Sequence, residues 1–515
     1  MKNTLLPIFA LSVLTTVQSV KAASYTFDPT VFGNQAWSTV ANWGTPGTVS
    51  PTTGDQATID RSTSTSDLNL TTPGTALSLR TLTLTAGSSS VLTLKLGNDL
   101  SLTNLTQSIF TNNISASQLV FDLNSYTFAT DGSSNGPFVR NSAPGLKYFT
   151  VKDTSVGGAG TINFGFYQQT SGNVSVLNNA TLRVSNTAGP GGTFSAYTIF
   201  STGSTFQIDT NTPTTQVWQS VVTGGTNTAG YGNVTIGSTT NSSRVTSVWF
   251  RGDSTHLNLT INGNFLLAQG SNIVLGNLVG QDLTGVSVKG NFTDQGSAIT
   301  TYQAAGSSTT FSLNGGIGTP HTLSINRTLN ATGGKVTNFQ IGDGTTAGNI
   351  ALVNAASNTV TALTTAGSVK VFGDSRLDLG TSTNSNAASL IAASINIVSG
   401  ATIADTFGAH SGFASTSGVL TLNTFNLQLT YDGTGWSNGN NLLLFHFASL
   451  TGTPTLGTVT ASGITYGSLF NDGSGNIFLT NVSVVPEPST AFLLMASFGS
   501  LVIWTVRRKR QFIKS

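Results

Sequence analysis

Cysteine is absent from this 515-residue chain, and Asp, Glu, Lys and Arg together make up only 8% of it. Without cysteine there is neither a disulfide framework nor a thiolate metal site. Glutamate is nearly missing as well, because Glu487 is the only one. Seven of the 21 lysines and arginines lie in the two terminal segments, which leaves 14 against 18 aspartates in the body. No basic patch is dense enough to predict a nucleic-acid partner.

Helical patterns are scarce too. The chain contains 58 glycines and much Ser, Thr and Asn, while 38% of its residues are hydrophobic. That apolar content is too high for a disordered chain, and the length is sufficient for a sizeable core. Short apolar runs among small polar residues predict a fold with many strands and many turns.

The first 23 residues have the layout of a secretory signal peptide. Lys2 supplies the positive start, Leu5 to Val17 is mostly apolar, and small residues at Ala22 and Ala23 offer a cleavage site. The apolar run is too short to span a membrane. We therefore expect export, with cleavage after Ala22 or Ala23.

The C-terminal 31 residues combine three features. A proline-flanked motif is followed by an apolar run over 491–506 and then by a basic cluster. As a helix, the run would cover about 24 Å, somewhat less than the roughly 30 Å apolar layer of a bilayer. The pattern predicts a short transmembrane helix whose basic stop stays in the cytoplasm, with the body outside the inner membrane. The motif is Val485, Pro486, Glu487, Pro488 and Ser489, and the basic stop is Arg507, Arg508, Lys509 and Arg510.

This order of parts resembles the PEP-CTERM sorting signal. The resemblance implies processing near the motif by an exosortase, a membrane enzyme, in a Gram-negative bacterium that makes exopolysaccharide. It covers about thirty residues, and five residues, 511–515, continue beyond the basic cluster. The alternative is an ordinary tail anchor in which the prolines merely end the preceding strand.

Between the termini, apolar residues alternate with polar ones at a period of two, which is typical of strands. Gly, Asn, Asp and Ser separate these runs at short intervals, so a sandwich, barrel or solenoid is favoured over a helical fold. Examples of the alternation are Leu77, Leu79, Leu82 and Leu84; Leu92, Leu94 and Leu96; Leu257, Leu259 and Ile261; and Val286 and Val288.

Weak internal repeats favour the solenoid. Residues 258–265 end in Gly-Asn-Phe, and so do residues 286–292, with the two tripeptides 27 residues apart. A strand that ends in Gly-Asn, recurring at about one coil, is what a parallel β-helix would produce. Asparagines at successive corners can share hydrogen bonds, and glycine permits the bend. A chain of β-sandwich modules is the alternative.

Two tryptophans stand near the N-terminus. Trp37 and Trp43, followed by residues 54–59, resemble the opening of exported, autotransporter-like repeat proteins, which continue into right-handed β-helices. If the segment is extended, the even spacing places both indoles on one face. They would stack on a sugar ring or, in the interpretation we favour, cap the apolar end of the solenoid.

Residues for catalysis are few. The histidines have no metal-binding spacing, and the carboxylates Asp374 and Asp378 are the nearest thing to an acidic cluster. The loop 471–476 resembles a calcium loop but has one carboxylate, so it predicts a turn. Arg251-Gly252-Asp253 fits a turn after a strand. We predict no enzyme, no catalytic residue, no metal and no cofactor. The four histidines are His256, His321, His410 and His446, and for His446 we expect a partly buried structural role.

Taken together, the sequence predicts an all-β protein, a right-handed parallel β-helix or solenoid with a short C-terminal transmembrane helix. The expected function is a structural or interaction protein of the cell envelope or extracellular matrix, associated with exopolysaccharide. An adhesin-like carbohydrate-binding protein is the first alternative, and a polysaccharide-active β-helix enzyme using an aspartate pair is the second. The expected segments are a signal peptide (1–23), a Trp-containing capping segment (24–62), solenoid repeats (63–419), a C-terminal β cap (420–484) and the sorting signal (485–515).

Overall fold

The computed structural model describes most of the chain between residues 22 and 485. The predicted leader up to residue 21 and the sorting signal from Pro486 onward lie outside the described residues. Within 22–485 the segments not described are 45–48, 88–89, 104–108, 113–117, 131–137, 142–147, 165–172, 186–197, 210–211, 220–229, 242, 244–245, 252–257, 276–283, 296–297, 302–307, 317, 326–327, 330–335, 354–362, 380–388 and 409–411.

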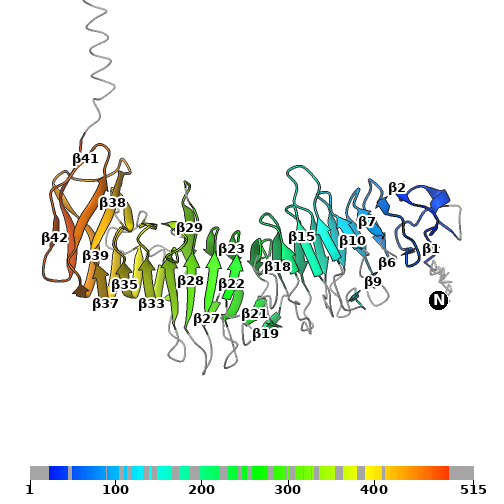
Figure 1. Cartoon of the computed structure of the whole chain (residues 1–515), viewed down its shortest axis with the longest axis horizontal. Coiled ribbons are helices and arrows are strands. Elements are labelled where there is room, and N and C mark those ends of the chain that lie inside the picture. Colours follow the sequence, from blue (N-terminus) through cyan, green and yellow to red (C-terminus); the bar gives the residue numbers. More distant parts are fainter. Residues whose placement is uncertain are drawn as a thin grey trace, which may run out of the picture.

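The described chain winds as a parallel β-solenoid, as the repeats predicted (Figure 1). One sheet of 15 strands runs along almost the whole length, and nearly every coil adds one strand to it. In chain order its strands are β5 (Leu77–Leu79), β8 (Leu100–Leu102), β11 (Thr127–Thr130), β14 (Thr161–Phe164), β16 (Thr181–Val184), β18 (Thr205–Ile208), β20 (Asn233–Ile236), β23 (Phe265–Leu267), β26 (Phe292–Asp294), β29 (His321–Ile325), β32 (Asn349–Leu352), β34 (Arg376–Asp378), β36 (Thr402–Phe407), β38 (Thr424–Tyr431) and β40 (Thr455–Thr460).

Two further sheets flank the long one over the N-terminal half of the molecule. The first has five strands: β1 (Ser24–Thr26), β3 (Gln56–Asp60), β6 (Thr81–Ala86), β9 (Ile109–Asn112) and β12 (Phe138–Asn141). The second has seven: β2 (Gly33–Ala36), β4 (Leu68–Thr71), β7 (Val91–Lys95), β10 (Gln118–Asp122), β13 (Tyr148–Lys152), β15 (Asn173–Leu177) and β17 (Thr198–Phe200).

Corresponding sheets flank it over the C-terminal half. One has four strands: β19 (Thr212–Gln219), β21 (Thr246–Arg251), β24 (Ser271–Leu275) and β27 (Ala298–Thr301). The other has twelve: β22 (Asn258–Ile261), β25 (Gly285–Val288), β28 (Thr309–Leu313), β30 (Thr328–Leu329), β31 (Thr337–Ile341), β33 (Leu363–Val371), β35 (Leu390–Ile397), β37 (Ala414–Leu422), β39 (Asn440–Thr451), β41 (Ile464–Thr465), β42 (Leu469–Asn471) and β43 (Asn476–Val484).

The Gly-Asn repeat sets the register between coils. Leu259 pairs with Val286 in one sheet, and Phe265 pairs with Phe292 in the next, so the 27-residue spacing is one coil. At the corner between these strands, the backbone amide of Asn264 donates to Asn233 Oδ1 over 2.8 Å, and that of Asn291 donates to Asn264 Oδ1 over 2.9 Å. The predicted asparagine ladder is therefore present.

The glycines of the repeat make room for this ladder. A Cβ atom on Gly263 would lie 2.3 Å from Asn233 Oδ1, and one on Gly290 would lie 2.5 Å from the carbonyl oxygen of Gly263. Both distances are far below van der Waals contact. Glycine is needed here because successive corners approach so closely that they leave no room for a side chain.

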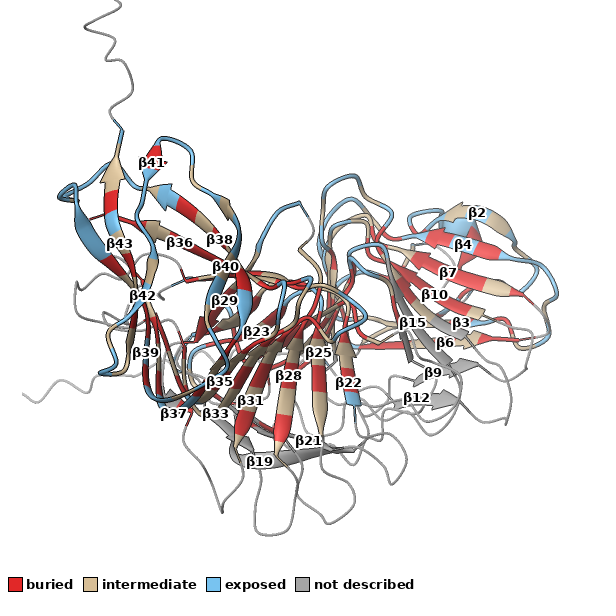
Figure 2. Cartoon of the chain, turned by 60° about the vertical axis from the view of Figure 1, so that its left-hand side comes forward, coloured by how far each residue is buried: buried red, intermediate tan, exposed pale blue. Residues whose placement is uncertain are grey.

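The core runs along the solenoid axis and is filled from every face (Figure 2). Alternating positions are buried, as in β33, whose side chains switch strictly between buried and partly exposed. Four phenylalanines from neighbouring coils form a continuous stack with ring centroids 5.1–5.5 Å apart. Such offset stacks add to the stabilisation from burial alone. The four are Phe265, Phe292, Phe311 and Phe339.

At the N-terminal end, the chain folds over the first coils. Val40–Asn42 form a short 3-10 turn, so the stretch between the two tryptophans is not extended, and the condition under which even spacing would place both indoles on one face is not met. The two indoles nevertheless meet, with ring centroids 4.7 Å apart, and Phe27 packs edge-on against Trp43 at 5.2 Å.

At the C-terminal end, the strand direction changes. Parallel pairing continues through β38 and β40 to Thr460, past the expected boundary at residue 420. Strand β43 then returns antiparallel to β39, and β41 and β42 pair antiparallel with β43. This antiparallel unit ends the twelve-stranded sheet with reversed strands, which closes the apolar end of the stack.

Candidate functional site

Both N-terminal indoles lie in the core. The exposed fraction of Trp37 is 0% and that of Trp43 is 2%. Trp37 Nε1 donates to the carbonyl of Pro51 over 3.0 Å, and Trp43 Nε1 donates to the carbonyl of Trp37 over 2.7 Å. Neither ring presents a face to solvent. The interpretation that this pair stacks on a sugar ring is therefore wrong, and the pair packs the end of the solenoid instead.

A buried arginine braces the same end. Arg61 is 1% exposed, and its Nη1 donates to the carbonyls of Pro29 and Val31, both over 2.6 Å. Its Nη2 donates to the carbonyl of Ser66 over 3.0 Å. Burial lowers the pKa of Arg61, and the charge of Asp28 opposes that effect. A planar guanidinium suits this bridging of several carbonyls, so its role is structural.

The two nearest aspartates of the sequence do not form an acidic site. Asp374 lies exposed in the turn before β34, while Asp378 pairs with Arg376 at 2.8 Å. Arg376 also donates to Gln428 Oε1 over 2.9 Å and to Asn349 Oδ1 over 3.2 Å, so it connects several coils. Within the described residues, no three His, Asp, Glu or Cys side chains gather as metal ligands.

The calcium-like loop is a turn that saturates its own carboxylate. Asp472 accepts hydrogen bonds from the backbone amides of Ser474 and Asn476 and from the Asn476 side chain. The side-chain bond from Asn476 is the main reason that the pKa of Asp472 is lowered. His446 is exposed and pairs with Asn476 Oδ1 at 2.8 Å, so the expectation of a partly buried His446 was wrong.

Two other sets of candidate residues from the sequence lie partly or wholly outside the described residues. Arg251 ends β21, whereas Gly252 and Asp253 lie outside the described residues. His256 and His410 also lie outside them. The sorting motif is represented only by Val485, which is 50% exposed directly after β43.

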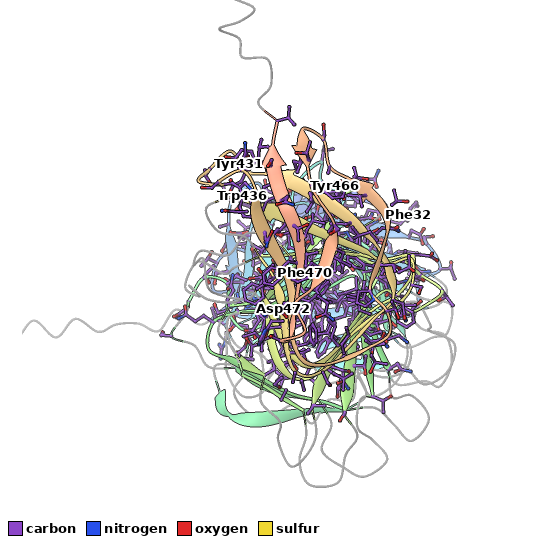
Figure 3. All side chains as sticks on the ribbon, turned by 90° about the vertical axis from the view of Figure 1, so that its left-hand side faces the viewer. Phe32, Tyr431, Trp436, Tyr466, Phe470 and Asp472 are labelled. Atoms are coloured by element: carbon purple, nitrogen blue, oxygen red, sulfur yellow. The ribbon has the colours of Figure 1, made fainter. Side chains whose placement is uncertain are left out.

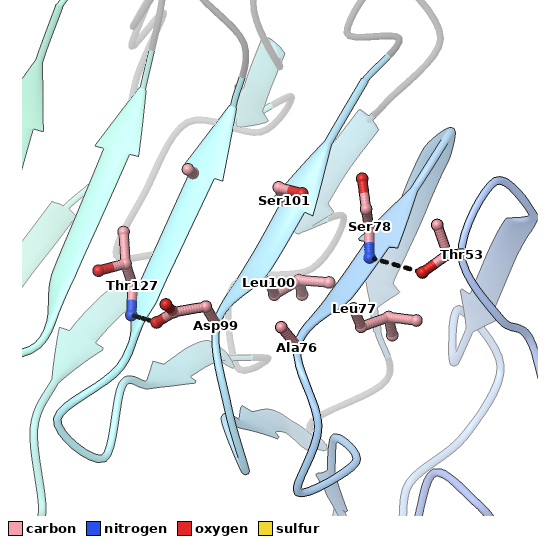
Figure 4. Close-up of a pocket in the computed structure, with 9 residues that line it drawn as sticks. Thr53, Ala76, Leu77, Ser78, Asp99, Leu100, Ser101 and Thr127 are labelled. Carbon is pink, nitrogen blue, oxygen red and sulfur yellow. Dashed lines mark hydrogen bonds between the residues drawn. The ribbon is translucent and has the colours of Figure 1, made fainter.

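A shallow groove of about 380 Å³ lies on the long sheet near the N-terminal end, across β5, β8 and β11 (Figure 4). Ser78, Ser101 and Ala129 are paired in register and point outward, so three small side chains from successive coils form its floor. Larger outward side chains would fill this space. Composition did not predict the groove, because its floor residues lie more than twenty positions apart.

The groove offers hydroxyls and one carboxylate. Asp99 Oδ1 accepts the backbone amide of Thr127 over 2.8 Å, which fixes the carboxylate at the groove wall. Thr53 lies at the opposite wall, where its Oγ1 is 3.5 Å from the amide of Ser78. The alanine and leucine atoms between these groups are apolar. Polar groups at the walls and apolar atoms between them suit a neutral ligand with hydroxyl groups.

The architecture places the chain in a class: an all-β parallel solenoid, in which the described residues include no helix long and apolar enough to cross a membrane. No family model, no curated protein and no solved structure matches the chain.

Proposed function

We propose that the protein is an exported structural or interaction protein of the cell envelope, held at the inner membrane by its C-terminal tail and then processed by an exosortase. The tail supplies the sorting motif, a short transmembrane helix and a basic stop, while the right-handed β-helix body extends into the envelope or matrix. The sequence of the tail supports the sorting step. The solenoid supports the role of the body.

One observation favours a structural body over an enzyme. The described coils are tied together by the asparagine ladder, the phenylalanine stack and parallel pairing along a 15-stranded sheet. Arg61 and Arg376 are engaged in structural contacts. A long body that is rich in Ser, Thr and Asn and poor in charged residues suits many weak hydrogen bonds to exopolysaccharide.

The sorting step is tested by the mass of the protein recovered from its native host. We expect a wild-type C-terminus near Pro488, whereas Glu487→Ala should keep the full-length tail and stay in the membrane. Asp432→Ala changes an exposed acidic residue outside the motif and should be processed normally. Recovery of wild-type protein that still carries residues 507–515 would contradict the processing step and leave a simple tail anchor.

A second candidate function is carbohydrate binding in the groove on β5, β8 and β11. Its support is the combination of serine and threonine hydroxyls with apolar atoms in the groove. Ser101→Arg should fill the groove and abolish binding of a neutral polysaccharide in affinity electrophoresis. Thr293→Arg, an outward position farther along the same sheet, is the matched control. Equal retardation of both variants would show that the groove is not the binding site.

A further inference from the structure

Three segments of the C-terminal unit converge where the chain leaves the solenoid. Strand β41 pairs with the end of β43 through Ile464 and Val484, and the amide of Val485 donates to the carbonyl of Gly463 over 2.8 Å. From a third segment, Trp436 Nε1 donates to the carbonyl of Val482 over 3.0 Å. We call this place the exit rim, formed by residues 436–439, 463–466 and 482–485.

The exit rim exposes amphipathic and apolar side chains. Tyr466 is 38% exposed and Val485 is 50% exposed, while Trp436 is partly buried against Phe407. Seen from the C-terminal end, Trp436 and Tyr466 lie near the upper edge of the molecule (Figure 3). Aromatic residues of this kind combine an apolar ring with one polar group, which suits the boundary between lipid and water.

The residues of the exit rim carry no charge, and the nearest charged residues in the sequence are Asp432, four positions before Trp436, and Glu487, two positions after Val485. Between Asp432 and Asp472 there is no Asp, Glu, Lys or Arg, and there is none from residue 473 to 485. The rim therefore brings no charge that would have to be desolvated next to lipid. The absence of Lys and Arg also excludes attraction to anionic headgroups as the reason for any contact.

The tail limits how far the rim can stand from a membrane. Five residues, 486–490, separate Val485 from the start of the apolar run at Ala491. Even fully extended, this linker spans only about 20 Å. An inserted anchor thus keeps the exit rim near the lipid headgroups for as long as the tail is uncut.

From the exposed Tyr466 and Val485, the absence of charge on the rim residues and the short linker, we infer that the exit rim rests on the lipid interface while the tail is inserted. This inference rests on the proposed membrane anchor. The occupant is the headgroup region of the bilayer, with Tyr466, Trp436 and Val485 at its boundary. The contact would hold the solenoid in a defined orientation on the membrane and bring the sorting motif close to the lipid surface.

The absence of native cysteine allows a direct test with single labels. The full chain, reconstituted in vesicles of phosphatidylethanolamine and phosphatidylglycerol, is labelled with bimane at Ser462→Cys, an exposed position directly before Gly463 of the exit rim. Ser474→Cys is the matched control, since it lies exposed beyond the opposite end of β43, roughly 30 Å away. Ser500→Cys, within the apolar run, reports on the anchor itself. Lipids that carry a nitroxide near the headgroup serve as quenchers.

We expect the quenchers to reduce the fluorescence of bimane at positions 462 and 500 and to leave that at position 474 unchanged. Adding Tyr466→Ser and Val485→Ser to Ser462→Cys should restore fluorescence at 462 without changing the signal at 500. Quenching at 500 but not at 462 would overturn the inference and leave the anchor intact. Absence of quenching at 500 would overturn both the anchor and the contact that depends on it.

Discussion

Asp405 should be a site where an acidic side chain costs stability. It is 1% exposed on β36, and its register partner in the next coil is the buried Leu429. Among the described residues, neither carboxylate oxygen has a hydrogen bond of normal geometry. Burial raises the pKa of Asp405 well above its usual value, the charge of Asp378 adds to this, and the backbone amides of Gly412 and Thr406 offset only part of it.

We predict that Asp405→Leu stabilises the protein. Relief of an unsatisfied buried polar group is worth about 1–3 kcal/mol, and the additional apolar side chain about 1.5 kcal/mol more, against about 1 kcal/mol for overpacking. The net gain is about 1.5–3.5 kcal/mol near neutral pH. Amides of β36 and β38 that exchange through opening of these coils should then exchange about 10- to 400-fold more slowly. Hydrogen exchange followed by mass spectrometry measures this.

The same prediction has a pH signature. Unfolded Asp405 loses its proton near pH 3.9, whereas the folded protein keeps it to a higher pH, so unfolding releases a proton between these values. The stability of the wild type should therefore fall as pH rises above about 4, by about 1.4 kcal/mol per unit until the folded pKa is reached. In urea denaturation, the stability of Asp405→Leu should not show this fall with rising pH. Asp374→Leu, at an exposed aspartate of the neighbouring coil, should change neither the stability near neutral pH nor the dependence of stability on pH. A gain that is equal at pH 5 and pH 8 would refute a neutral carboxyl in the folded state.

Three further substitutions test the coil contacts, and urea denaturation measures all of them. Gly263→Ala should destabilise by about 1–3 kcal/mol, since its Cβ would meet Asn233 Oδ1 at 2.3 Å, while Gly74→Ala, with nothing within 4 Å, should be nearly neutral. Arg61→Lys should cost roughly 3 kcal/mol because an ammonium cannot reach all the carbonyls that the guanidinium bridges, and an equally large loss in the exposed Arg80→Lys would contradict this reasoning. For Asp153, burial raises the pKa, but hydrogen bonds from Ser155, Gly160 and Ser125 outweigh it and lower the pKa overall. The stabilisation from Asp153 is present above about pH 3.9 and is lost as pH falls through the lower folded pKa. Asp153→Asn should therefore make the stability of the protein less dependent on pH in this acidic range.

The fold could be predicted because local spacing and coil geometry agree. The Gly-Asn steps at 263–264 and 290–291 mark the same corner of adjacent coils, and the structure pairs them as the repeat indicates. Alternation at Leu77 and Leu79 likewise predicted which side chains are buried. Both signals lie within a short window or recur at a fixed period, which is why one sequence suffices to read them.

Features that depend on several coils at once could not be predicted. Asp405 lies between the buried Ile403 and Phe407, so alternation places it inward, but only the surrounding coils show that no described side chain there hydrogen-bonds its carboxylate. The groove exists because Ser78, Ser101 and Ala129 happen to be small at the same register position in three coils. For Trp37 and Trp43, the turn at Val40–Asn42 changed the geometry that even spacing suggested. In each case the decisive information is the side chain that stacks above or below.

Parallel stacking also fixes the length of the body in steps of one coil. Neighbouring strands in a sheet lie about 4.8 Å apart, so the 15 strands of the long sheet extend over roughly 67 Å. Duplication or deletion of one coil in the gene would lengthen or shorten the body by a single such step without changing its cross-section. The length of the body can therefore evolve in small, discrete increments while the two ends, which carry the specialised contacts, stay the same.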